Sequence, residues 1–124
     1  MQVKEFSFEK LNVWQKSRVL VKEIYSNTKL FPQDERYGLC SQMQRAAISV
    51  MSNIAEGSSR KSKKDQSNFY QIGYSSLMEL INDIIIIRDL EFIKQNEYEK
   101  LRNMSAEVSM MLNALYVSIR GKNA

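Results

Sequence analysis

Four stretches of this sequence carry apolar residues at intervals of three and four, and this spacing constrains the fold more than any other feature. Residues spaced in this way lie on one face of an α-helix. The spacing predicts helices over about residues 9–29, 34–56, 63–92 and 96–120. Pro32 ends the first of them, Gly57 suits the end of the second, and Ser62 is a candidate N-cap for the third.

Residues that favour tight turns are scarce, with four glycines and one proline, so a sandwich or barrel of short hairpins is disfavoured. The predicted connections are short, and short links make consecutive helices antiparallel neighbours. We therefore expect one all-α domain over residues 1–124, an antiparallel up-down-up-down four-helix bundle.

The third predicted helix is more apolar than a bundle requires. We expect its buried stripe to include Phe69, Ile72, Leu77 and Leu80, which leaves Tyr70 and Tyr74 as exposed rings. Successive residues of a helix point about 100° apart, so four consecutive isoleucines cover its whole circumference. One interpretation is a wide core stripe, and the other is an oligomer interface. We predict an oligomer interface at Ile84, Ile85, Ile86 and Ile87.

Catalytic and metal-binding patterns are missing from the sequence. It has no histidine and one cysteine, Cys40, which we interpret as a small core residue. Glu79 and Asp83 lie on one predicted helix face, and we interpret them as a solvated acidic face or an intersubunit partner rather than a metal site. We expect no enzymatic activity, no catalytic residues, no cofactor and no metal.

Positive charge is concentrated in the first half of the chain. The formal net charge is +4, and Arg60, Lys61, Lys63 and Lys64 together carry the same number of positive charges. A basic cluster attracts polyanions, although it can also be a solvated loop. Arg45 and Arg60 flank a polar line on the second predicted helix, which is either a hydrogen-bond network or a phosphate-binding edge.

We therefore predict RNA or DNA binding at Arg45, Arg60, Lys61, Lys63 and Lys64. The alternative is a protein-interaction scaffold or accessory subunit, in which the basic and acidic halves of neighbouring copies dock during self-assembly. The sequence shows neither a secretory leader nor about 20 consecutive apolar residues, so we expect a cytoplasmic protein without a membrane span.

Several runs resemble the bacterial four-helix-bundle proteins encoded in intervening sequences of 23S rRNA genes. The most specific is Ser52-Asn53-Ile54-Ala55-Glu56-Gly57 followed by Arg60, and Ser76-Leu77-Met78-Glu79-Leu80 is a second anchor. The resemblance extends over nearly the whole chain and is densest over residues 11–80.

The resemblance implies a homopentamer of four-helix subunits around a central channel, with no enzymatic activity. It also implies distant kinship with an accessory protein of diversity-generating retroelements that binds nucleic acid and a reverse transcriptase. Residues 84–87 are more uniformly aliphatic here than the family pattern, so the interface is expected to differ in detail.

Overall fold

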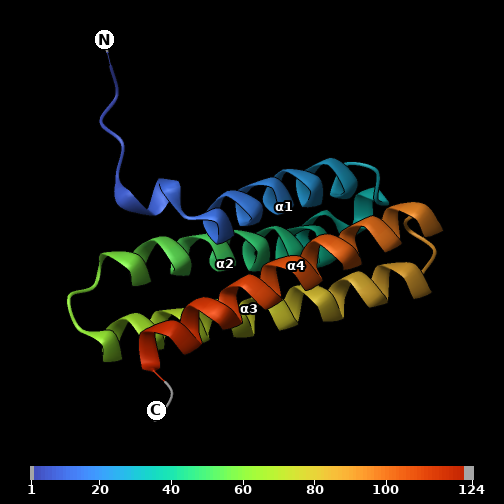
Figure 1. The fold of residues 1–124 in the computed structure, drawn as a ribbon. Coiled ribbons are helices and arrows are strands. Elements are labelled where there is room, and N and C mark those ends of the chain that lie inside the picture. Colours follow the sequence, from blue (N-terminus) through green and yellow to red (C-terminus); the bar gives the residue numbers. More distant parts are fainter. Residues whose placement is uncertain (1, 122–124) are drawn as a thin grey trace.

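Four long helices lie side by side in the computed structural model, which describes residues 2–121. They are α1 (Asn12–Thr28), α2 (Ser41–Ser59), α3 (Lys63–Asp89) and α4 (Gln95–Arg120). Successive helices run in opposite directions, and α4 returns beside both α3 and α1 (Figure 1). The predicted all-α four-helix bundle is confirmed.

The segments that lead into α1 and α2 are less regular than the sequence pattern suggested. A short 3-10 turn, η1 (Ser7–Lys10), precedes α1, and Leu11 adopts an extended conformation between them. Before α2 come η2 (Gln33–Glu35) and one π-helical turn, η3 (Arg36–Cys40). Gly38 breaks the regular geometry there, with φ −103° and ψ −106°. The expected continuous helix from residue 34 is therefore wrong in its first turns.

The C-terminus of α3 is closed by a Schellman motif, in which the last carbonyls are satisfied by amides beyond the helix. The amide of Phe92 donates to the carbonyl of Ile87 at 2.9 Å, and the amide of Glu91 donates to that of Arg88 at 2.9 Å. Glu91 has a φ of 61°, which is left-handed and ends the helix. The predicted helix to residue 92 is thus too long.

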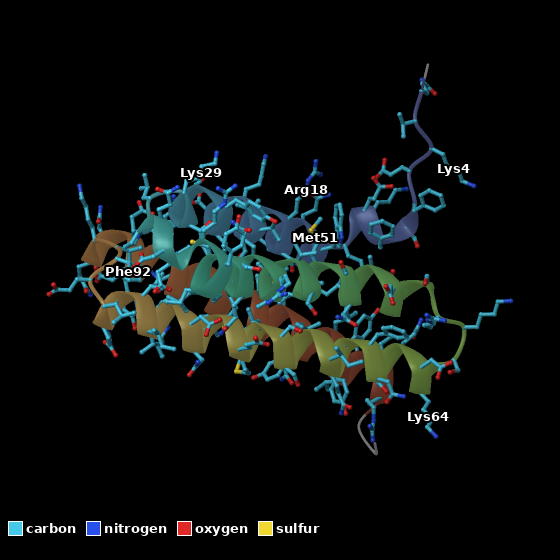
Figure 2. All side chains as sticks on the ribbon, turned by 180° about the vertical axis from the view of Figure 1, so that it is seen from behind. Lys4, Arg18, Lys29, Met51, Lys64 and Phe92 are labelled. Atoms are coloured by element: carbon cyan, nitrogen blue, oxygen red, sulfur yellow. The ribbon has the colours of Figure 1, made fainter. Side chains whose placement is uncertain are left out.

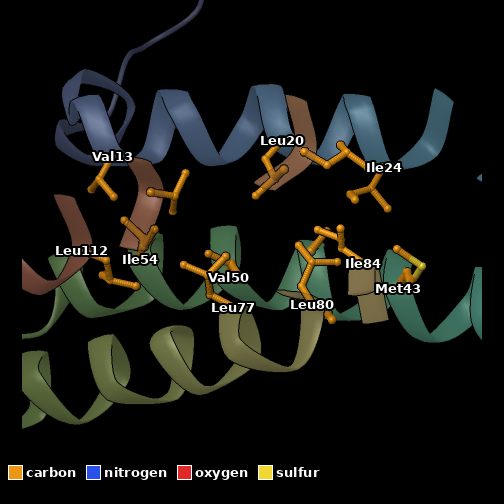
Figure 3. Packing of buried hydrophobic residues seen from close by; sticks show 14 of the residues in the cluster. Val13, Leu20, Ile24, Met43, Val50, Ile54, Leu77, Leu80, Ile84 and Leu112 are labelled. Carbon is orange, nitrogen blue, oxygen red and sulfur yellow. The ribbon is translucent and has the colours of Figure 1, made fainter. Parts of the chain in front are cut away.

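One contiguous core runs along the bundle axis. Side chains from all four helices meet in it, including Leu20 and Ile24 of α1, Val50 and Ile54 of α2, Leu77, Leu80 and Ile84 of α3, and Leu112 of α4 (Figure 3). Cys40 is also buried and its thiol donates a hydrogen bond to the carbonyl of Thr28, so its expected place in the core is confirmed.

In its first turns, α3 buries a different face from the one predicted. Tyr70 is 2% exposed and Ile72 is 52% exposed, while Phe69 is half-buried. The expectation of a buried Phe69 and Ile72 beside an exposed Tyr70 is therefore wrong. Tyr70 can enter the core because the facing residue on α2 is Gly57, where an added Cβ would stand 2.6 Å from the tyrosine ring.

Gly57 lies inside α2, not beyond its end as predicted. The helix continues to Ser59, and the amide of Arg60 closes it by donating to the Gly57 carbonyl at 3.2 Å. Its missing side chain serves the close approach of α2 and α3, so the need for glycine here comes from packing and not from a left-handed conformation.

Candidate nucleic-acid interface

The connection between α2 and α3 is short and is fixed by hydrogen bonds. The Ser62 hydroxyl accepts from the Asp65 amide at 3.1 Å, which confirms the predicted N-cap of α3. The Gln66 side-chain amide donates to the carbonyl of Arg60 at 3.0 Å. The loop backbone is therefore held in one arrangement at the tip of the bundle, where Figure 2 places Lys64.

Four cations, which we call the loop cations, extend from this connection and from the first turn of α3. Arg60, Lys61, Lys63 and Lys64 are exposed. The Arg60 guanidinium stacks over the ring of Phe69 at 4.5 Å from the ring centre, and this contact orients it. Lys63 and Lys64 also begin a helix of 27 residues, whose N-terminus carries a partial positive charge.

Carboxylates do not neutralise these four side chains in the described part of the chain. Its ion pairs join Lys16 to Glu107, Lys100 to Glu23, and Arg88 to the adjacent Asp89. All three pairs lie outside the α2–α3 loop, so the loop cations present their charge to solvent.

Arg120 is a fifth cation at this end, and the sequence reasoning missed it. Together with Ile119 of α4, it lines a shallow pocket that Lys63, Lys64 and Ser67 of α3 also line. Arg120 donates to the hydroxyl of Tyr116 at 3.0 Å. An antiparallel pairing of the third and fourth helices places the end of the fourth beside the start of the third. The predicted topology therefore already implied that Arg120 lies near Lys63 and Lys64.

Arg45 does not join the group. It lies on α2, 15 residues before Arg60, which directly follows the last residue of that helix, and the separation corresponds to about 22 Å along the axis at 1.5 Å per residue. It lines a separate shallow pocket between α2 and α3 with Gln42, Ser49 and Glu79. The structure thus brings four of the five predicted binding residues together and leaves Arg45 apart.

The four consecutive isoleucines divide between the core and the surface. Ile84 and Ile87 are fully buried within the chain, which corrects their assignment to an oligomer interface. Ile85 is partly buried against the core and Ile86 is 36% exposed, so Ile86 is the isoleucine most available to a partner. The four isoleucines together cover the whole circumference of α3, and Ile86 is the one that is exposed.

The remaining polar candidates serve packing between α2 and α3. Asp83 is fully buried, and both of its carboxylate oxygens accept from the Gln42 side-chain amide at 2.9 Å, so its interpretation as part of a solvated face is wrong. Asn53 donates to the Ser49 carbonyl and hydroxyl, and the Ser49 hydroxyl bonds that of Ser76 at 2.7 Å.

Metal-binding clusters and membrane-spanning helices are both missing from residues 2–121. Acidic and cysteine side chains do not gather there in a group of three that could hold a metal ion. In the same range, none of the helices combines the length and the apolar character needed to cross a membrane.

Comparison with known proteins settles the family. The sequence model of the 23S rRNA-intervening sequence proteins matches residues 9–114. The chain belongs to this family. The match takes in all of α1, α2 and α3 and most of α4, so it includes the α2–α3 loop and its cations but ends before Arg120.

A solved structure shares the fold. It is the crystal structure of a protein of unknown function from the S23 ribosomal protein family of Bacteroides thetaiotaomicron, with a TM-score of 0.78 and 23% sequence identity. The alignment covers 84% of this chain and 94% of that one. No curated protein matches the sequence.

Proposed function

We propose that this protein is a non-enzymatic, self-associating four-helix bundle that binds RNA or DNA at the end of the bundle formed by the α2–α3 loop and the C-terminus of α4. The observation that carries the proposal is the group of five cations at this end, Arg60, Lys61, Lys63, Lys64 and Arg120. The ion pairs of the described chain leave all five unneutralised.

A nucleic-acid backbone is the polyanion that such a group fits best. Lysines on a helix N-terminus and arginines with fixed guanidinium planes are the usual contacts to phosphate oxygens. Here the Phe69 ring orients Arg60, and the Tyr116 hydroxyl holds Arg120. Contacts to phosphates do not distinguish one base from another, so we expect a weak sequence preference. Because these contacts are ionic, we expect nanomolar-to-micromolar binding that weakens steeply as salt concentration rises.

The test compares two charge-reversed variants by fluorescence anisotropy with labelled RNA and DNA at about 50 mM salt. The loop variant replaces Arg60, Lys61, Lys63 and Lys64 with glutamate. The control variant replaces Arg36, Lys22, Lys29 and Lys94, one arginine and three lysines that are also exposed. Figure 2 places Lys29 far from Lys64. Both variants change the net charge equally.

We expect the loop variant to lose binding and the control variant to keep most of it. Absence of binding by the wild-type protein, or equal loss in both variants, would contradict the proposal. The solution mass of the loop variant tests the scaffold alternative. Under that alternative, the variant dissociates into monomers because its basic half no longer docks on the acidic half of a neighbour.

Self-association is proposed on a separate observation, the exposed apolar side chains on the outer face of α3. Ile72 is 52% exposed and Ile86 is 36% exposed. They are 14 residues apart, close to four helical turns, and therefore share one face of the helix. Burying such a pair against another copy removes apolar surface from water, which favours association.

A further inference from the structure

A cleft between α3 and α4 lies beside the basic end of the bundle. Tyrosine, amide and small side chains surround it: its walls are Tyr70, Gln71, Tyr74, Ser75, Leu112, Asn113 and Tyr116. Its volume is about 360 Å³, within the range of about 300–1,000 Å³ that small-molecule sites occupy. None of the seven wall residues is charged, so the cleft suits a neutral, planar group better than a phosphate.

The aromatic walls of the cleft are held in place. The Tyr116 hydroxyl accepts hydrogen bonds from the Gln71 side-chain amide at 2.7 Å and from Arg120 at 3.0 Å. Tyr70 packs against Gly57, and its ring forms one edge of the cleft. Tyr74 is 39% exposed, which leaves part of its ring free to stack on a ligand.

Arg120 connects the cleft to the cation group. Its guanidinium lies 5.6 Å from the centre of the Tyr116 ring, and it also lines the pocket shared with Lys63 and Lys64. Ser67 of that pocket and Gln71 of the cleft are four residues apart on α3, about 6 Å along the axis. A single nucleic-acid strand can therefore place one of its phosphates against the cations and one of its base rings in the cleft.

We propose that this tyrosine cleft binds an unpaired nucleobase, so that the ligand of the basic end is single-stranded RNA or DNA. The inference rests on the proposed function, which supplies the phosphate contacts. Aromatic side chains beside a cationic track are the usual means of holding single strands, and the Asn113 and Gln71 amides offer hydrogen-bond partners to a base edge. Bases of a duplex are paired and stacked, so they cannot enter without being flipped out.

The experiment measures how one exposed tyrosine affects single-strand and duplex binding. Anisotropy titrations use a labelled single strand of about 12 nucleotides and the blunt duplex of the same sequence. Tyr74→Leu removes the aromatic ring and keeps an apolar side chain. The matched control is Tyr25→Leu, because Tyr25 is 37% exposed, close to Tyr74, and lies on α1 away from the cleft. Circular dichroism checks that both variants fold.

We expect Tyr74→Leu to weaken single-strand binding by about fivefold or more and to leave duplex binding unchanged. Tyr25→Leu should behave as the wild type. Crosslinking of a strand that carries 5-iodouracil should map to peptides containing Tyr74 or Tyr116. Unchanged single-strand affinity in Tyr74→Leu, equal weakening of strand and duplex, or crosslinks confined to other tyrosines would overturn the inference.

The two proposals fail in different ways. If the wild-type protein binds neither strand nor duplex, the proposed function fails and the base site fails with it. If charge reversal of the loop abolishes binding while Tyr74→Leu leaves strand affinity intact, the basic end binds nucleic acid and the base site alone is refuted.

Discussion

At the scale of single residues, Gly57 has the most demanding position in the chain. An added Cβ would stand 2.6 Å and 2.9 Å from two carbons of the Tyr70 ring, closer than packed atoms tolerate. Gly73 is a useful comparison, since its nearest neighbour would be the Cβ of Asn53 at 3.3 Å. Both glycines lie inside helices, so replacement by alanine gains the same helix propensity of about 1 kcal/mol in each.

We predict that Gly57→Ala is less stable than Gly73→Ala by about 1–3 kcal/mol, the usual cost of overpacking a well-packed site. Urea denaturation of both variants and the wild type measures the free energy of unfolding. A Gly57→Ala protein as stable as Gly73→Ala would show that the Tyr70 ring moves aside freely.

Cys40 is a second residue whose chemistry follows from its surroundings. Burial, and to a lesser degree the charge of Glu35, raises the pKa of this thiol above its ordinary value of 9.0. The unfolded chain therefore loses the thiol proton at a lower pH than the folded chain does. The contribution of Cys40 to stability is complete below about pH 9 and falls as pH rises above it.

We predict that iodoacetamide labels Cys40 slowly in the folded protein at pH 8 and rapidly after unfolding in urea, because the thiolate is the nucleophile and the native thiol is both buried and protonated. Mass spectrometry follows the labelled fraction with time. Equal rates in the folded and unfolded protein would contradict the burial of this side chain.

At the scale of elements, the sequence located four helices but not the face that α3 buries in its first turns. Apolar periodicity favoured Phe69 and Ile72, which are more hydrophobic than Ser67 and Tyr70. The deciding factor lies on another helix: α2 offers no side chain at Gly57, so the Tyr70 ring fills that space. The hydrophobic pattern of α3 alone does not show where the neighbouring helix lacks a side chain.

Some helix ends could likewise be predicted from the local sequence, and others could not. The Ser62 N-cap was predictable because its hydroxyl acts within its own segment. The end of α3 was not, because Glu91 is neither glycine nor asparagine and still adopts a left-handed φ of 61°. Contacts beyond the helix, such as Phe92 against Phe31 at 5.5 Å between ring centres, accompany this unfavourable conformation.

We predict that Glu91→Gly stabilises the protein by about 0.5–1 kcal/mol, because glycine adopts the left-handed conformation without the steric penalty of a Cβ. Glu91→Ala is the control, since it removes the same charge and keeps the Cβ. Thermal and urea unfolding of the two variants measures the difference. Equal stability of the two would show that backbone strain at this position is negligible.

At the scale of the whole molecule, the antiparallel arrangement accounts for the site. It brings the end of α4 beside the start of α3, so Arg120 joins a loop more than 50 residues earlier in the chain. The sequence indicated the loop cations because they are contiguous. It could not assemble the tyrosine cleft, whose walls come from two helices and whose register depends on the buried position of Tyr70.

The exposed isoleucines of α3 give a prediction at the same scale. We expect the wild-type protein to be oligomeric in sedimentation velocity, and the double variant Ile72→Glu/Ile86→Glu to be monomeric. The control is Val19→Glu/Val117→Glu, which charges two comparably exposed valines on α1 and α4. A monomeric wild-type protein, or dissociation of the control alone, would refute an interface on this face of α3.

The salt dependence of single-strand affinity tests the central claim most directly, because it counts the phosphates that the basic end neutralises. If all five cations contact phosphates, the logarithm of the association constant falls with the logarithm of salt concentration at a slope of about −3.5. We predict this slope for the wild-type protein and a slope near −0.7 for a charge-neutral variant with glutamine at positions 60, 61, 63 and 64, which retains Arg120. A wild-type slope near zero, or the same slope in both proteins, would contradict the account.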